Sequence, residues 1–105
     1  MKVEIFGRKD CSVCGGIKDK FTLFLERWGV AGSVVVEYHD TETVDGLSKM
    51  MQRGCRDVPA VVILDYGGQV VVTWQGRPIE SKEFKPYFEH LKKTLPNAVS
   101  EKNNA

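Results

Sequence analysis

The feature that most constrains this chain is a pair of cysteines, Cys11 and Cys14, set between a strand pattern and a helix pattern. Residues 2–6 (KVEIF) alternate apolar and charged side chains, which predicts a short strand that ends at Gly7. Apolar side chains then recur at the spacing of one helical face, at Ile17, Phe21, Phe24, Leu25 and Trp28. Gly29 supplies a helix stop signal. Both cysteines are therefore expected at the amino end of a helix that follows a strand directly.

The middle of the chain continues to alternate strands and helices. Residues 33–39 (SVVVEYH) form a β-branched run of the kind buried in a parallel sheet, so a right-handed βαβ crossover is expected. After cap candidates at 40–43, a second helix that stops near Gly54 is predicted by the spacing of Val44, Leu47, Met50 and Met51. The segments PAVVIL and QVVVTW then predict two strands of a hairpin, with Gly67 and Gly68 in its turn.

The last predicted element is a helix over residues 81–95, and its apolar positions are Phe84, Tyr87, Phe88, Leu91 and Leu95. Pro86 complicates its start, because proline is well tolerated only in a first helical turn and biases Lys85 away from the helical region. The regular helix is therefore expected to begin nearer Lys85 than Ser81.

Composition limits the classes of protein to which the chain can belong. Its 105 residues, 42% of them hydrophobic, suit one compact domain, assigned to residues 1–95, with residues 96–105 as a flexible tail. A formal charge of +1 lacks the basic excess of a nucleic-acid-binding protein. Glu4 interrupts the apolar start before a signal-peptide core can form, and no transmembrane stretch follows. Three cysteines do not make the even set of a disulfide-stapled scaffold, so a reducing, cytoplasmic setting is expected. The chain is also expected to be a monomer.

The cysteine pair has the chemistry of a redox centre. The thiolate is the reactive form of cysteine, and the unpaired N–H groups and dipole of a helix amino terminus favour it, which suits Cys11 as the attacking thiol. Cys14, one helical turn further along, can resolve the mixed disulfide that Cys11 forms with a substrate. The pair can thus return a substrate disulfide as a dithiol.

Two other interpretations of the pair stay open. A zinc site needs four ligands, and the remaining thiol and imidazole groups, Cys55, His39 and His90, have irregular spacing. A cysteine-based module that holds zinc or a shared iron–sulfur cluster is the alternative to an enzyme. Unreactive thiols in a helix are the other interpretation, which a C-x-x-C motif near a βαβ pattern disfavours. Cys55 itself is expected as a small buried hydrophobe or, alternatively, as a regulatory or third redox thiol.

Pro59 opens the strand PAVVIL, where a proline cannot donate to the sheet. On its own it fits a trans proline at a strand start. Together with the CSVC motif upstream and a strand, hairpin and helix downstream, it resembles the thioredoxin-like superfamily over residues 2–95. The resemblance implies the minimal form of that α/β fold, βαβαββα, with a mixed four-stranded sheet flanked by three helices. It also implies a cis Val58–Pro59 bond lying against the Cys11 and Cys14 sulfurs.

The resemblance also implies a substrate groove. The Val58 backbone would pair with an extended substrate segment, and Gly76 would border the groove. Lys9, two positions before Cys11, is similar to a basic residue of glutaredoxins, whereas the hairpin VVILDYGGQVVVTWQG looks more like thioredoxin. The segment WQGRPIES does not reproduce the glutaredoxin motif that holds glutathione, and Ile5 stands where thioredoxins carry a buried acid.

The resemblance and the chemistry of the pair together predict a thiol–disulfide oxidoreductase of the glutaredoxin or thioredoxin type. Cys11 is expected as nucleophile and Cys14 as resolving residue, and the substrate-binding positions are expected at Lys9, Val58, Pro59 and Gly76. Beyond the redox-active disulfide, no tightly bound cofactor and no metal are expected. The expected partners are protein disulfides and an electron donor, either a thioredoxin-reductase-like flavoprotein or glutathione, with neither nucleic acid nor membrane.

The other large apolar side chains and the two histidines complete the expectations. Trp28, Met50 and Met51 are expected in the core, and Trp74 and Tyr66 in hairpin packing or at the groove. His39 and His90 are expected at structural or surface positions.

Overall fold

The computed structural model describes residues 1–11 and 14–94 of the chain. Its strands are β1 (Lys2–Gly7), β2 (Val35–Asp40), β3 (Ala60–Leu64) and β4 (Val70–Gln75). Its helices are α1 (Cys14–Arg27), α2 (Val44–Gln52), α3 (Ser81–Phe84) and α4 (Glu89–Thr94), with short 3-10 segments η1 (Ala31–Ser33) and η2 (Lys85–Tyr87). The predicted end of the domain at residue 95, the tail 96–105 and the SV dipeptide of the CSVC motif lie outside the described residues.

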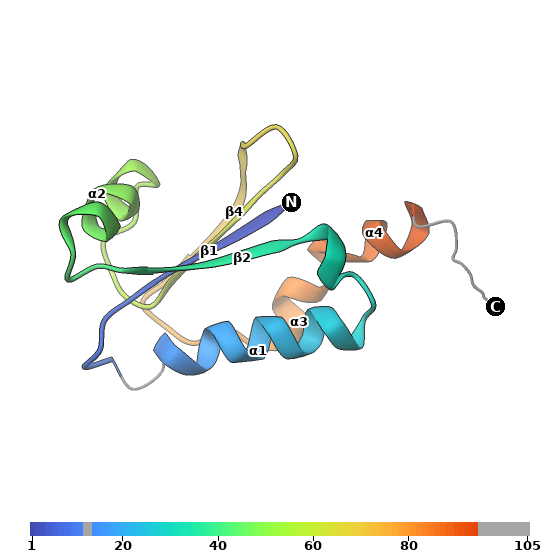
Figure 1. The fold of residues 1–105 in the computed structure, drawn as a ribbon, viewed down its shortest axis with the longest axis horizontal. Helices are drawn as coiled ribbons and strands as arrows, with labels where there is room; N and C mark the ends of the chain where they lie inside the picture. Colours follow the sequence, from blue (N-terminus) through green and yellow to red (C-terminus); the bar gives the residue numbers. More distant parts are fainter. Residues whose placement is uncertain (12–13, 95–105) are drawn as a thin grey trace.

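The four strands form one mixed sheet in the order β2-β1-β3-β4. β1 pairs with β2 in parallel, and β3 pairs with β1 and with β4 in antiparallel fashion. Figure 1 shows α1 and α3 on one side of the sheet and α2 on the other. The predicted fold class is confirmed. The element order and the sheet agree with βαβαββα when α3, η2 and α4 are taken together as the single last helix.

β2 corrects one expectation about burial. The run from residue 33 was expected to lie inside the sheet, but η1 occupies residues 31–33 and the strand begins at Val35. β2 is an edge strand, and Val35 is 56% exposed. A β-branched run reports strand preference, whereas the position of the strand within the sheet depends on pairing with the rest of the chain.

Two apolar clusters hold the layers together, one on each side of the sheet. The larger lies between the sheet and the helices α1 and α3, where Phe21 stacks on Phe84 with ring centroids 4.1 Å apart. Trp28 packs against this cluster as expected, and Trp74 contacts Tyr87 edge to face. The smaller cluster lies under α2 and comprises Phe6, Met50, Cys55, Ala60, Val62 and Leu64.

α2 begins and ends where its signals predict, but it buries a different face. The Thr43 hydroxyl accepts from the Gly46 N–H at 3.0 Å and caps the helix. Gly46 and Met50 are the buried residues of this helix. Gly46 packs directly against the carbonyl group of Asp40 at the end of β2, where any side chain would collide. The expectation of Met51 in the core is wrong, since Met51 is 68% exposed. The close approach of Gly46 to Asp40 therefore determines which face of α2 packs against the sheet.

The carboxyl-terminal helix also differs from its prediction. It begins at Ser81 and not near Lys85, because Glu80 and Glu83 form a reciprocal capping box at its first turn. Pro86 lies inside η2, which separates α3 from α4. The proline thus interrupts the helix with a 3-10 turn without preventing its start.

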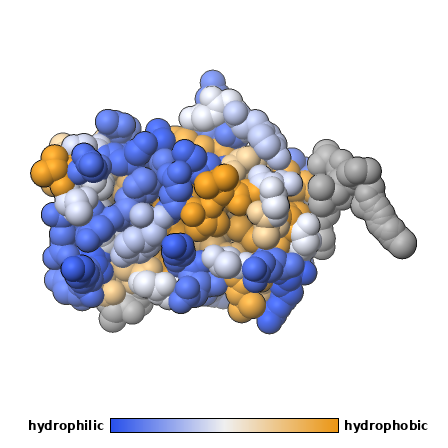
Figure 2. Space-filling model, in the orientation of Figure 1, coloured by the Kyte–Doolittle hydropathy of each residue, from blue (hydrophilic) through white to orange (hydrophobic). Residues whose placement is uncertain are grey.

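The surface in Figure 2 is apolar over the middle of the sheet, and at the α2 end a hydrophobic spot stands out from hydrophilic surroundings, in keeping with the exposed Val44, Leu47 and Met51. Tyr66 is exposed on the hairpin and, with Val35 and Leu64, lines a hollow of about 340 Å³. This hollow lies at the Lys2 end of β1, opposite the end that leads to the cysteines. Tyr66 is therefore neither packed in the hairpin nor placed at the predicted groove. In the part of the chain that the structure describes, no helix has the length and apolar character needed to cross a membrane.

Candidate active site

The structure places the cysteine pair between β1 and α1, as predicted. Arg8 follows β1, and its carbonyl oxygen accepts from the Cys11 N–H at 3.1 Å. Cys14 is the first residue of α1, and its N–H donates to the Cys11 carbonyl oxygen at 3.4 Å. A disulfide joins Cys11 and Cys14, whose Cα atoms are 5.4 Å apart. Cys11 is partly exposed, whereas Cys14 is completely buried.

The loop between α2 and β3 meets the pair at the same edge of the sheet. Phe6 pairs with Ala60 in the β1–β3 ladder, so Pro59 lies beside Gly7, the last residue of β1. The Val58–Pro59 peptide bond is cis, the isomer that the resemblance implied. In residues 1–11 and 14–94, the backbone N–H and C=O of Val58 make no hydrogen bond. Both groups are available to a bound peptide segment.

The end of β4 holds this loop in place. Gly76, at φ +80°, donates its N–H to the Pro59 carbonyl oxygen at 3.0 Å, so the structure brings these two predicted residues together. The side-chain oxygen of Gln75 accepts from the N–H of Arg56 at 2.8 Å and from that of Asp57 at 3.2 Å. Sequence reasoning missed Gln75, because a polar residue at a strand end carries no local signal of what it contacts.

The remaining predicted substrate residue, Lys9, is exposed in the turn before Cys11. The ion pair of this turn joins Arg8 and Asp10 at 3.4 Å, and both side chains are largely exposed. Exposed pairs of this kind contribute little to stability. Lys9 therefore stays a predicted substrate residue, two positions before Cys11 along the chain.

A pocket of about 270 Å³ lies between the two segments. Its polar lining includes Arg8 and Arg56, and its apolar lining comes from Leu47, Met50 and Val58. It therefore adjoins both the turn that precedes Cys11 and the residue that precedes the cis proline.

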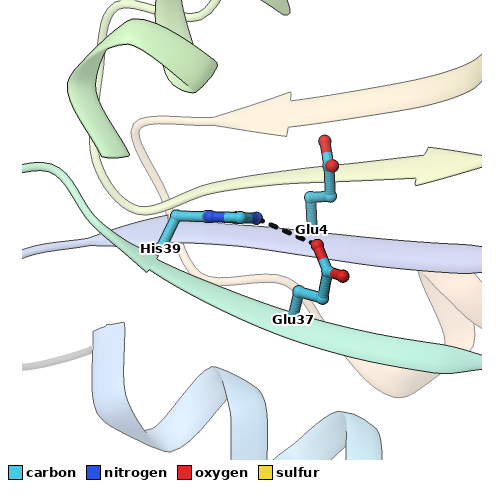
Figure 3. A group of neighbouring side chains, drawn as sticks. All are labelled: Glu4, Glu37 and His39. Carbon is cyan, nitrogen blue, oxygen red and sulfur yellow. Dashed lines mark ion pairs between the residues drawn. The ribbon is translucent and has the colours of Figure 1, made fainter. Parts of the chain in front are cut away.

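A group of charged side chains that the sequence did not predict lies on the α2 side of β1. Figure 3 shows His39 and Glu37 of β2 joined by an ion pair, with Glu4 of β1 beside them. Glu4 is completely buried, and Arg53 donates to both of its carboxylate oxygens, at 2.6 and 3.1 Å. Burial opposes ionisation of Glu4, but the hydrogen bonds and charge of Arg53, with the charge of Lys49, keep its pKa below the ordinary value.

Two carboxylates and an imidazole are donors that can hold a divalent cation, and their ligand atoms lie within 4.8 Å of one another. The surrounding charge opposes such a site. Both Glu4 oxygens are engaged by Arg53, and Lys49 Nζ lies 4.0 Å from Oε2. His39 has its own local contacts, since it stacks on Phe6 and its Nε2 lies 3.2 Å from Glu37. The group is better described as an ion-pair network around the buried Glu4 that joins α2 to the sheet.

Cys55 lies in the cluster under α2 and is 3% exposed, as expected for a buried hydrophobe. Burial raises the pKa of its thiol. Among the described residues, no group of three potential metal ligands includes a cysteine. His90, on α4, is exposed.

Comparison with known proteins places the fold. No protein-family model and no curated protein sequence is similar enough to match the chain. Thioredoxin 1 of Thermosipho africanus superposes with a TM-score of 0.67 at 23% identity, over 92% of this chain and 100% of that one. Oxidised thioredoxin O2 of Arabidopsis thaliana gives 0.67 at 17% identity, over 86% of this chain and 73% of that one.

A chain from the complex of ferredoxin:thioredoxin reductase with thioredoxin f2 gives a TM-score of 0.63 at 20% identity, over 87% of this chain and 76% of that one. At these identities the likeness concerns the backbone arrangement. The strand order, the position of the cysteine pair before α1 and the cis proline before β3 are in place. The chain has the thioredoxin fold.

Proposed function

We propose that the chain is a thiol–disulfide oxidoreductase that reduces or exchanges disulfides of protein substrates through a reversible Cys11–Cys14 disulfide. The observation that carries the proposal is the placement of the two sulfurs. They are bonded to each other where α1 begins, and Cys11 is open to solvent while Cys14 is buried behind it. This is the arrangement that a two-step exchange needs, since only one sulfur has to meet the substrate.

The first step uses the electrostatics of the helix. In the dithiol form, the dipole and unpaired N–H groups of α1 favour a thiolate on Cys11, and no acidic side chain lies in the first turn of α1 to oppose it. The thiolate attacks one sulfur of the substrate disulfide. A mixed disulfide forms, the substrate S–S bond breaks, and the released substrate thiolate takes up a proton from solvent.

The second step closes the cycle within the chain. Cys14 loses its proton to solvent and its thiolate attacks the Cys11 sulfur. The Cys11–Cys14 bond forms, the mixed disulfide breaks, and the second substrate thiolate is released and protonated. Two electrons have passed from the protein dithiol to the substrate, which leaves as a dithiol.

Substrate positioning is assigned to the loop before β3. The free N–H and C=O of Val58 can pair with an extended substrate segment as an added strand, beside Pro59 and Gly76. The pocket between Arg8 and Arg56 can take a neighbouring side chain. This placement supports a protein or peptide substrate in preference to a small rigid disulfide.

The oxidised protein needs an electron donor, and a thioredoxin-reductase-like flavoprotein or glutathione would supply it. The fold similarity to a thioredoxin crystallised with its reductase supports a protein donor. The two donors are separated by reducing the oxidised protein with glutathione and, in parallel, with a thioredoxin-reductase system, while the free thiols are counted.

Dithiol-dependent reduction of insulin tests the function itself. The wild-type chain and Cys55→Ala should both be active, and Cys11→Ser should be inactive. Cys55→Ala is the matched control because Cys55 lies in the apolar cluster under α2 and is not part of the Cys11–Cys14 disulfide. Stoichiometric zinc or iron in protein made under reducing conditions, with no insulin reduction, would contradict the proposal.

A further inference from the structure

Gly7 marks a point of very close packing beneath the disulfide. A Cβ atom built on Gly7 would lie 2.6 Å from Cys14 Cβ, 2.9 Å from Cys14 Sγ and 2.5 Å from the Tyr38 hydroxyl oxygen. The phenol oxygen and the Cys14 sulfur therefore border the same small space. Because Gly7 has no side chain, the Tyr38 hydroxyl and the Cys14 sulfur can both lie against this space.

Tyr38 reaches this space from β2. It pairs with Ile5 in the parallel β1–β2 ladder, and its ring packs against the cluster on the α1 side of the sheet. Among the described residues its hydroxyl makes no hydrogen bond. Burial, together with the negative charges of Asp40 and Glu42, raises the pKa of Tyr38 above its ordinary value. The phenol is therefore neutral in the physiological range and holds a proton that it can donate.

Cys14 needs such a donor. A completely buried thiol resists ionisation because the thiolate loses its solvation, yet the resolving step proceeds through the thiolate. The only completely buried carboxylate among the described residues, Glu4, faces α2 on the other side of the sheet and is occupied by Arg53. Glu4 is therefore not a partner of the Cys14 sulfur.

We propose that, in the reduced protein, the Tyr38 hydroxyl donates a hydrogen bond to the Cys14 thiolate and so makes Tyr38 a catalytic residue of the resolving step. This inference rests on the proposed function. The phenol keeps its proton throughout, and the proton of Cys14 passes to solvent. The thiolate that forms attacks Cys11 as described above, so the bond and electron balance of the cycle is unchanged.

The first test is a titration of Cys14 that does not depend on turnover. Reduced protein carrying Cys11→Ser, with ¹³C-labelled cysteine, is titrated by NMR both with the native Tyr38 and with the added substitution Tyr38→Phe. The Cys14 pKa should be about one unit higher in Tyr38→Phe. Tyr87→Phe is the matched control, because Tyr87 packs on the same cluster and touches Trp74. An unchanged Cys14 pKa, or an equal rise in Tyr87→Phe, overturns the proposal.

The second test measures the resolving step directly. With Cys11 in place, Tyr38→Phe should resolve a mixed disulfide on the order of tenfold more slowly at neutral pH, the loss should shrink at high pH, and alkylation of Cys11 should keep its rate. Equal resolution rates overturn the proposal.

A fluorinated tyrosine at position 38 keeps the test open if Tyr38→Phe fails to fold. Its more acidic phenol should lower the Cys14 pKa, and no change would overturn the hydrogen bond. A wild-type chain that reduces no disulfide, but in which the Cys14 pKa responds to Tyr38, would sink the proposed function and leave the hydrogen bond standing.

Discussion

At the scale of single residues, the site depends on which sulfur can be reached. Cys11 precedes α1 and is partly exposed, while Cys14 begins the helix and is completely buried. The two cysteines are joined by a disulfide but differ in their exposure to solvent. The proposed function therefore predicts that Cys11 reacts before Cys14.

The division of labour between them can be trapped. Cys14→Ser should accumulate a mixed disulfide with insulin or glutathione, because Cys11 can still attack but no thiol remains beside it to resolve the product. Cys11→Ser should trap almost nothing. Intact-mass spectrometry under non-reducing conditions reads the adduct, and iodoacetamide labelling should find Cys11 reactive below the ordinary thiol pKa of about 8.5. A stable adduct on Cys11→Ser would reverse the assigned roles.

A second prediction at this scale concerns Gly7. Gly7→Ala should destabilise the oxidised protein by about 1–3 kcal/mol, because the new methyl group meets Cys14 and Tyr38 in a space already full. Gly16→Ala is the control, since a Cβ on Gly16 in α1 has nothing within 4 Å. That variant should be equally or slightly more stable, as alanine suits a helix better than glycine. Equal urea midpoints for the two variants would refute the packing argument.

At the scale of elements, the end of β4 supports the loop that carries Val58 and Pro59. Gln75 accepts two backbone N–H groups of this loop, and Gly76 donates to Pro59. These contacts join residues that are far apart in the sequence, so the loop and the hairpin form one structural unit. Substrate binding should therefore respond to changes at the end of β4.

Gln75→Met should raise KM for a peptide disulfide several-fold and leave kcat and the alkylation rate of Cys11 nearly unchanged. The methionine removes the acceptor, so the Arg56 and Asp57 N–H groups lose the partner that orders the loop. Gln75→Glu keeps a side-chain oxygen and should recover much of the KM. Steady-state kinetics with both variants decides the matter, and equal KM values in Gln75→Met and wild type would show that Gln75 has no positioning role.

The elements themselves were largely predictable from local patterns. Helical spacing from Ile17, the Thr43 cap and the cysteine pair each act over a few residues, and the structure has them where they were expected. The errors occur where distant contacts decide. Met51 is exposed because Gly46 fits against Asp40, and the last helix starts early because Glu80 and Glu83 cap each other. The Gln75 contacts and the meeting of Tyr38 with Cys14 likewise require the finished topology.

At the scale of the whole molecule, the network of Glu4, Arg53 and Lys49 joins α2 to the central strand. Sequence alternation treats Glu4 as a polar position between apolar ones, as it would be on a strand with one face in solvent. β1 instead lies between β2 and β3 and is covered on both faces. Residues 3–7 are therefore all buried, whichever face of the sheet they point to. The order of the strands is needed to see that Glu4 is buried and therefore requires a basic side chain such as Arg53 as its partner.

This network makes stability depend on pH. The folded-state pKa of Glu4 lies below its unfolded value, so its contribution is fully present above the unfolded pKa of about 4.3 and is lost as the pH falls through the folded pKa. Glu4→Gln should lower the free energy of unfolding at neutral pH by about 1–3 kcal/mol, because the partly exposed Arg53 loses its charged partner. The difference from wild type should narrow in acid.

Urea unfolding of both proteins across that pH range measures the effect. The double variant Glu4→Leu, Arg53→Met serves as the control, since replacing both charges with apolar side chains should restore much of the loss. A gap between wild type and Glu4→Gln that stays constant down to strongly acid pH would show that ionised Glu4 is not the source of the effect.

The close approach at Gly7 has a consequence for how such sequences can diverge. Proteins of the same fold need share only 17–23% of their residues with this chain. At Gly7, by contrast, any side chain would displace both the Cys14 sulfur and the Tyr38 hydroxyl beside it. Among descendants that keep this chemistry, Gly7 should therefore change as rarely as the cysteines, and a survey restricted to reactive groups would overlook it.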